Sequence, residues 1–464
     1  MRQRRSMPAP IPLTCAPSGS GSDTSLPVSP AGIAPVPVLV HSFGGSMFTI
    51  VTPRLRLTAL ALLIVAPWPA HTQPGPTFAQ ALRRAAHVSA ATQAAQAAED
   101  AAAQTAARAG QLPDPMLKIG IDNLPVSGPD RFTTSGEPMT MRRIGIEQQW
   151  VSADKRQARA TRATRAVAAE QAATRQTAAQ VREEAGKAWL DLFHAQRAAE
   201  LASQLADEMR RDLAGVQAAH RGAKAGAADV LQARMALAQA EDDAAGAEQE
   251  RRTAAVRLAR WLQEPVDTVD GAPPAYTAAP AAAGTALQRP AVLAARRAID
   301  LADADTAVAT RERHPDWTFE AGFGQRSSRY GNMVSFGISV PLTVDRAQRQ
   351  DRDVAEKSAL GTRARLLYDD TLQAQEAQVR QLSEELDSLN TRIARLEAGL
   401  LPAAAEQVEL AVAAYRSGAG SLSAVFQARR ALLEKRLQIN MLARQAGATW
   451  AALVLPANDE GDAQ

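Results

Sequence analysis

The sequence predicts a mainly helical protein with a small β part, built from two copies of a strand pair followed by a long helical hairpin. One repeat is carried by the segment HRGAKAGAADVLQAR from His220 and the segment YRSGAGSLSAVFQAR from Tyr415, which align in register. A second repeat, at nearly the same offset, is carried by IGIEQQWVSADKRQAR from Ile144 and FGISVPLTVDRAQRQ from Phe336. Each member of this second pair runs from a strand-like pattern into a helical one. Self-similarity at a fixed period indicates a duplicated supersecondary unit.

Composition supports closely packed helices over a conventional globular core. Only 4% of the 464 residues are aromatic, while alanine is abundant, and small residues let helices approach one another. The 52 basic and 49 acidic residues leave a net charge of +3, which is too balanced for a nucleic-acid-binding surface. Cys15 is the single cysteine, so the chain has no intramolecular disulfide and no thiolate metal cluster.

The first part of the chain predicts export. Residues 1–46 are rich in Pro, Ser and Gly and predict either disorder or translation from an upstream start. Residues 47–72 predict a secretory signal peptide, because Arg54 and Arg56 precede the apolar run Leu57–Ala66. That run is too short to cross a bilayer as a mature helix.

The first repeat is expected over residues 77–265. An Ala-rich helix from Thr77 to Gly110 is followed by strands at about 116–122 and 141–151. Asp154 is a candidate N-cap for a helix with no breaker before Gly222. Such a helix is about 100 Å long at ~1.5 Å per residue, and it is stable only when it packs sideways against others. The hairpin tip is placed at 220–229, and Pro265 ends the return helix.

The second repeat is expected over residues 286–455, after a Pro/Ala/Gly-rich connector at 266–284. Its predicted elements are a helix at 286–313, strands at about 317–325 and 334–343, a long helix at 347–417 interrupted at Pro402, a hairpin tip at 415–424 and a return helix at 422–453. The acidic tail 456–464 is expected to be disordered.

The four strands indicate assembly in a membrane. Four amphipathic strands cannot close a barrel, and a bilayer does not tolerate bare sheet edges. Three chains would supply twelve strands, enough for a closed barrel with a water-filled bore. The loops Leu124–Pro138 and Arg326–Met333 would then share the outer side, with the helices in the periplasm. A soluble β-layer beside a coiled coil accounts for the strands equally well.

The hairpin tips carry a resemblance. A pattern of an aromatic residue, a glycine three positions on and then an apolar-Asp-Val-Leu-x-Ala run is matched in the second copy by Tyr415, Gly418, Val425, Phe426 and Ala428. The first copy reads Asp229 to Ala233 in the same run, with His220 in the aromatic position. Over residues 77–455 the chain resembles the TolC-type outer-membrane efflux factors. The resemblance implies a homotrimeric passive channel, not an enzyme: an outer-membrane β-barrel on a periplasmic α-helical barrel that docks to a periplasmic adaptor protein and an inner-membrane pump.

Three short segments suggest a subgroup. Asp114-Pro115, Asn123-Leu124-Pro125 and Met139-Thr140-Met141 resemble the heavy-metal branch, which serves cobalt–zinc–cadmium and copper–silver pumps of the resistance–nodulation–division type. Export of drugs or other small molecules by the same architecture stays open. A periplasmic adaptor would have one hairpin and a β-rich C-terminal half, and a soluble coiled-coil scaffold would need neither an export signal nor these strands.

Two sets of residues are candidate interaction sites. The adaptor-docking tips comprise Gly222, Gly226, Asp229, Val230, Leu231, Tyr415, Gly418, Gly420 and Val425. A possible collar facing lipid headgroups comprises Lys155, Arg156, Arg159, Arg346 and Arg349; the alternative is a solvated face paired with nearby acids. Asp229 is either part of an acidic ring in the pore or a cap of the return helix. The six histidines lack ligand spacing, so no metal site, cofactor or catalytic residue is predicted.

Overall fold

The computed structural model describes residues 75–277 and 286–457, all within one structural unit. The expected extension 1–46, the signal peptide 47–72 and Cys15 lie outside the described residues, as do the last residues of the tail.

The described elements follow the duplicated order that the sequence predicts. The first copy contains α1 (Phe78–Val88), α2 (Ala90–Arg108), β1 (Met116–Asp122), β2 (Met141–Trp150), α3 (Ala153–Arg221) and α4 (Ala227–Leu262). The second contains the short helix η1 (Ala286–Gln288), α5 (Pro290–Glu312), β3 (Trp317–Gln325), β4 (Met333–Ser339), η2 (Arg346–Gln348), α6 (Gln350–Arg395), the π-helix η3 (Leu396–Leu400), α7 (Leu401–Arg416) and α8 (Leu422–Val454). The prediction of a mainly helical fold with a small antiparallel sheet is confirmed.

Two helix boundaries differ from the expectation. The helix expected from Thr77 to Gly110 is broken at Ser89, whose backbone is extended and whose hydroxyl accepts a hydrogen bond from Thr92 N at 3.4 Å. Ser152, rather than Asp154, is the N-cap of α3, because its side chain accepts from Lys155 N. Serine competes with the helix backbone for these N–H groups, so it starts helices more readily than it continues them.

The expected interruption near Pro402 takes the form of a π-helical segment. The five residues of η3 separate α6 from α7, so Pro402 falls in the first turn of α7. The chain stays helical here, since Leu401 N donates to Leu396 O, and the wider π-helical turn replaces the regular i→i−4 bonding that a proline interrupts.

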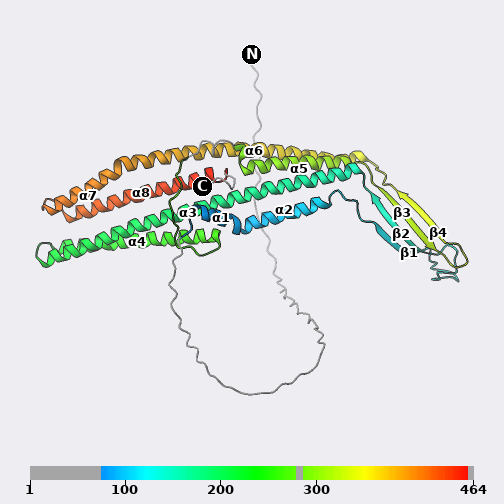
Figure 1. Cartoon of the computed structure of the whole chain (residues 1–464), viewed down its shortest axis with the longest axis horizontal. Coiled ribbons are helices and arrows are strands. Elements are labelled where there is room, and N and C mark those ends of the chain that lie inside the picture. The colour runs from blue at the N-terminus through cyan, green and yellow to red at the C-terminus, as the bar shows by residue number, and fades with distance from the viewer. Residues whose placement is uncertain (1–74, 278–285, 458–464) are drawn as a thin grey trace, which may run out of the picture. The chain divides into compact units, whose positions relative to one another are not determined.

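The four strands form one antiparallel sheet in the order β1-β2-β3-β4. The second and fourth strands end at Trp150 and Ser339, one and four residues before the expected ends. The two interstrand loops lie at the same end of the sheet, as expected (Figure 1). Arg326 joins them, since its guanidinium donates to Gly331 O at 2.7 Å and to Pro138 O at 3.2 Å.

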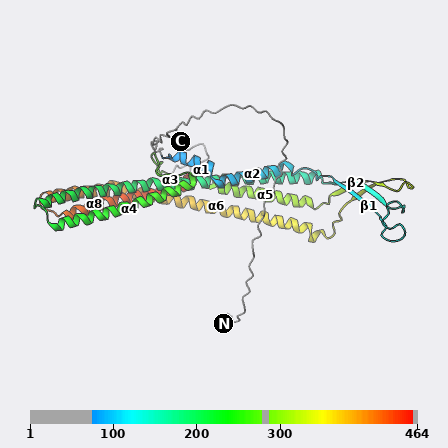
Figure 2. The ribbon, with the colours of Figure 1, turned by 90° about the horizontal axis from the view of Figure 1, so that it is seen from below.

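Helix α3 organises the helical part of the unit. It packs against α2, α4, α5 and α8, and so against both copies of the repeat (Figures 1 and 2). One buried cluster, which includes Trp189, Leu258 and Leu453, lies where α1, α3, α4, α6 and α8 meet. A second cluster, which includes Met209, Ala233 and Phe426, joins the α3–α4 hairpin to α8 nearer the turns. Both clusters mix repeats, so the copies are folded against each other and are not independent domains.

Candidate functional site: a two-faced sheet and two hairpin tips

One face of the sheet is apolar and exposed. The pairing Leu117↔Ile146↔Ala321↔Phe336 places these four side chains on the same face, and alternation extends the face along each strand. The large side chains of this apolar face are at least 40% exposed: Leu117, Ile119, Ile121, Ile144, Ile146, Trp150, Trp317, Phe319, Phe323, Val334, Phe336 and Ile338. An exposed patch of this extent marks an interaction surface.

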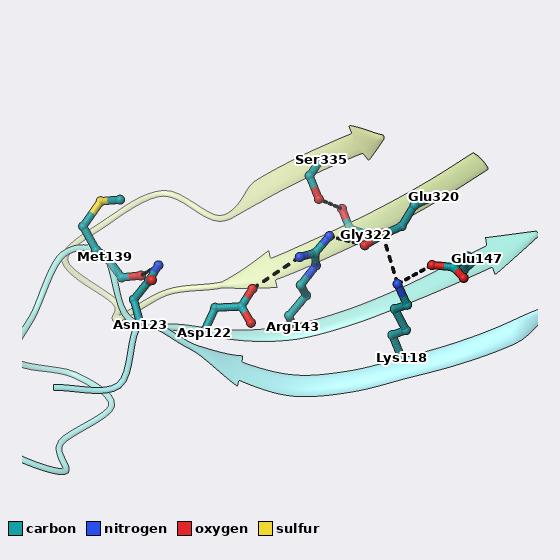
Figure 3. A network of polar contacts seen from close by, with 9 residues as sticks. All are labelled: Lys118, Asp122, Asn123, Met139, Arg143, Glu147, Glu320, Gly322 and Ser335. Atoms are coloured by element: carbon teal, nitrogen blue, oxygen red, sulfur yellow. Dashed lines mark hydrogen bonds and ion pairs between the residues drawn. The ribbon is translucent and has the colours of Figure 1, made fainter. Parts of the chain in front are cut away.

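The opposite face carries a network of charges across three strands (Figure 3). Lys118 Nζ on β1 contacts the carboxylate of Glu147 and lies 3.2 Å from Glu320 Oε2. Arg143 on β2 contacts Glu320 and lies 3.5 Å from Asp122 Oδ2. Glycines leave room for these long side chains: a Cβ on Gly322 would stand 3.1 Å from Arg143 Nε.

One apolar exposed face opposite one charged face is the alternation expected of strands in a membrane barrel. Transmembrane barrel strands alternate apolar outward and polar inward, with aromatic residues at the membrane interfaces. Trp150 and Trp317 form a cross-strand pair on the apolar face, at the end of the sheet next to the helices. Within residues 75–277 and 286–457, no helix combines the length and apolar content needed to cross a membrane.

At the first tip the turn does not depend on glycine for its left-handed residue. Gly222 has φ −88°, whereas Ala223 has φ 55°, so an alanine and not a glycine supplies the positive φ of this turn. His220 Nδ1 lies 2.8 Å from Ala225 O across the turn. Asp229 Oδ2 accepts from Gly226 N at 2.9 Å, so the Asp229 side chain caps the start of α4 from its first turn. The capping interpretation of Asp229 therefore has a geometric basis.

At the second tip glycine is required at two positions for different reasons. Gly418 has φ 75°, a conformation that other residues adopt only with strain. Gly420 approaches the preceding helix so closely that a Cβ would lie 2.9 Å from Ala414 Cβ. A Cβ on Gly418 would meet no atom within 4 Å, so this position faces open space.

Not every expected docking residue is accessible. Leu231 and Tyr415 are 60% and 37% exposed. Val425 is only 4% exposed, and Val230 packs against the cluster that joins the hairpins. These two valines support the tips from inside, because apolar β-branched side chains at the start of α4 and α8 face the neighbouring helix.

The expected headgroup collar is wrong for Lys155. Its side chain is 5% exposed and lies 2.6 Å from Asp316 Oδ1. Arg156 is half-buried and donates to the carbonyls of Val151 and Gly110. Arg159 is half-buried and pairs with Glu312 at 3.1 Å, and the exposed Arg346 pairs with Asp351 at 3.5 Å. Helical spacing places these basic residues on one face of a helix. The acidic residues that pair with Lys155 and Arg159, however, come from distant parts of the chain.

A buried polar network links the connector to both repeats. His194 Nδ1 lies 2.9 Å from Asn440 Oδ1, and its Nε2 lies 2.9 Å from Tyr276 Oη. Asn390 Nδ2 donates to Tyr276 O at 2.9 Å. Burial and the nearby Arg444 charge lower the pKa of His194, although Asn440 and Asp191 act in the opposite direction. The sequence analysis did not single out Tyr276. The available signal was that Tyr276 is the one aromatic residue in the connector 266–284.

Metal ligands do not gather in the part of the chain that the structure describes: no group of three or more His, Cys, Asp or Glu side chains there is placed to hold an ion.

Known proteins share this architecture. Residues 284–457 match a family model described as outer membrane efflux protein. The chain superimposes on the open state of the MtrE outer membrane channel of Neisseria gonorrhoeae with a TM-score of 0.69 at 16% identity, covering 83% of this chain and 89% of that one. The Campylobacter jejuni CmeC outer membrane channel gives 0.68 at 11% identity, with 89% and 95% covered. CusC gives 0.66 at 17% identity, with 82% and 92% covered. No curated protein sequence matches the chain.

The two-faced sheet and the long helical hairpins are the fold of these solved outer-membrane channels. The family model covers the second repeat, and the first repeat has the same order of elements. The family match over the second repeat and the shared fold both agree with the resemblance to the TolC-type outer-membrane efflux factors that the tip motif indicated.

Substitutions at Asp229 separate capping from charge. Asp229→Asn keeps an oxygen that can accept from Gly226 N, whereas Asp229→Ala removes it. We expect Asp229→Ala to destabilise the start of α4 by about 1 kcal/mol and Asp229→Asn to remain close to the parent in thermal stability. Cation selectivity, measured as reversal potential in planar bilayers, should be unchanged in Asp229→Asn. Lowered cation selectivity in that variant would instead support an acidic ring.

His194 should make stability depend on pH. Its pKa in the folded protein lies below the ordinary value of 6.5, so the unfolded chain binds the proton more tightly. The stability is therefore fully present above about pH 6.5 and is lost as the pH falls toward the depressed folded pKa. Thermal unfolding followed by circular dichroism should show a drop in midpoint from about pH 7.5 to pH 5 that is smaller in His194→Gln. The exposed His87→Gln should behave like the parent; an unchanged drop in His194→Gln would contradict the assignment.

Proposed function

We propose that three copies of this chain close a twelve-stranded barrel in the outer membrane and form the passive exit duct of a tripartite efflux system. The observation that carries the proposal is the sheet itself. It has one predominantly apolar exposed face, on which Arg142, Gln148 and Gln325 are the polar exceptions, and one charged face. Its two outer edges, on β1 and β4, have no partner strand among the described residues. Each edge would pair with the opposite edge of the next copy, because a bilayer leaves no other partner for these backbone groups.

The charges orient the sheet in this barrel. Lys118, Arg143, Asp122, Glu147 and Glu320 share one face, and a charge facing lipid costs up to ~2–4 kcal/mol at mid-bilayer. The charged face therefore lines the bore and the apolar face meets lipid. Two cations and three anions per chain nearly cancel, so the network stabilises the wall of the bore without creating a strong electrostatic barrier to passage.

The two hairpin tips are the proposed contact with a periplasmic adaptor, through which the duct would engage an inner-membrane pump of the resistance–nodulation–division type. Small residues at both turns leave the backbone open to close approach, and Gly418 faces open space. Leu231 and Tyr415 provide exposed apolar surface beside the turns.

Heavy-metal cations are the proposed substrate class, and drugs or other small molecules are the alternative. The proposal rests on the resemblance of three short segments beside the strands. In the structure two of them contact each other: Asn123 Nδ2 donates to Met139 O at 3.2 Å (Figure 3). Thr140 Oγ1 also donates to Asn123 O at 2.9 Å. These residues join the two ends of the loop between β1 and β2. They therefore support the heavy-metal assignment through the structure of this loop and not as ligands of a cation.

Assembly tests the duct. Mass photometry of the detergent-purified protein should give three times the mass of one mature chain, because two unpaired edges require neighbours. A uniform monomer that nevertheless inserts into membranes would contradict the barrel.

Gly418 variants test docking. Gly418→Ala and Gly418→Trp both place a side chain at φ 75°, which costs on the order of 1–3 kcal/mol, but only tryptophan adds bulk toward open space. We expect both variants to form trimers at near-normal abundance. Efflux-dependent resistance and adaptor crosslinking should survive in Gly418→Ala and be lost in Gly418→Trp. Equal loss in both variants would show that turn geometry, and not access to the tip, is what matters.

A further inference from the structure

A groove of about 830 Å³ lies at the junction of the sheet and the helices. Its walls include Trp150, Trp317 and Phe319 from the sheet, Asp154 from the first turn of α3, Arg311 from the last turn of α5, and His314 from the link between α5 and β3. The volume is within the range of small-molecule sites.

The groove is layered. The three aromatic side chains belong to the apolar face, at the end of the sheet next to the helices, and are 52%, 50% and 40% exposed in the order Trp150, Trp317 and Phe319. The ionic groups begin where the strands end. An apolar layer followed directly by an ionic layer matches the order of acyl chain and headgroup in a lipid leaflet.

The ionic layer contains one accessible charge of each sign. Arg311 Nη1 lies 3.6 Å from Asp154 Oδ2, and the two side chains are 57% and 75% exposed, so the pair is loose and open to a ligand. Lys155 also borders the groove, but Asp316 holds it in a buried pair. A ligand that fits both accessible charges carries an anion and a cation side by side.

We propose that this groove binds the headgroup of a zwitterionic aminophospholipid, with the phosphate on Arg311 and the ammonium on Asp154. The acyl chains lie along Trp150 and Trp317. The inference rests on the proposed barrel, which turns the apolar face toward lipid. β2 and β3 are the inner strands of the sheet, so the groove is clear of the edges that neighbouring copies would occupy. Lipid recognition on the periplasmic side thus belongs to this groove and not to Lys155.

The test uses the trimer reconstituted into phosphatidylglycerol vesicles that contain increasing fractions of phosphatidylethanolamine with brominated acyl chains. Bromine quenches the fluorescence of tryptophans that contact lipid, here Trp150 and Trp317. Trp189, Trp261 and Trp450 lie on the helices, where Trp189 and Trp450 are buried and Trp261 is half-buried, and they add a constant background. The quenching curve yields the preference for phosphatidylethanolamine over phosphatidylglycerol at the groove.

We expect a preference of about two- to fivefold in the parent, the range that exposed charged contacts provide. Asp154→Asn leaves Arg311 unopposed and should abolish or reverse the preference. The double variant Asp154→Asn/Arg311→Gln should show none. A matched ion pair elsewhere on α5, Arg297 with Asp300 at 3.1 Å, provides the control: Arg297→Gln/Asp300→Asn should keep the parent preference.

Absence of a preference in the parent, or its persistence in Asp154→Asn, would overturn the lipid site. Vesicle flotation and trimer analysis of the same preparations keep this outcome separate from the proposed function. A parent that inserts as a trimer without lipid preference refutes the groove alone, whereas a parent that does not insert refutes the barrel.

Discussion

The structure depends on one constraint: the backbone N–H and C=O groups of a sheet placed in lipid must all find partners. Among residues 75–277 and 286–457, the outer edges of β1 and β4 leave two rows of these groups without a partner strand. The same sheet exposes every large apolar side chain of one face. A soluble protein would cover such a face with a helix, yet the helices here extend from one end of the sheet (Figure 1). In the proposed barrel, the sheet of one chain forms one part of the wall and pairs its two edges with neighbouring copies.

A second constraint is that helices as long as these must pack sideways along their whole length. A helix of 69 residues such as α3 cannot be maintained by local propensity alone and needs continuous lateral packing. Alanine supplies much of that contact: Ala163, Ala179, Ala185, Ala195 and Ala202 are all at most 3% exposed along this one helix. Small side chains bring neighbouring helices close, and the few aromatic residues gather where α3 crosses α8 and the connector.

That crossing explains why the two repeats fold as one unit. Tyr276 contacts His194 of α3 and Asn390 of α6, and a Cβ on Gly447 of α8 would stand 3.0 Å from the Tyr276 ring. The connector thus takes part in the core rather than bridging two finished domains. The Pro- and Ala-rich sequence of the connector did not predict this role, because a single aromatic residue in a linker shows no periodic pattern that would indicate a buried position.

The sequence by itself determined the order of elements, since duplication, alternation and long uninterrupted helical patterns are local properties. The first strand was located to the residue at Met116–Asp122, because prolines and polar loop residues bound a strict alternation. It also located both tips, where glycine and the family motif coincide. Tertiary structure alone decided what individual side chains do. Lys155 was expected to meet lipid, but Asp316, far along the chain, buries it. Val425 was expected to meet a partner, but the neighbouring helices cover it. Pairing between distant residues follows from how helices and strands are juxtaposed in space, and periodicity specifies a face of a helix without specifying what lies against it.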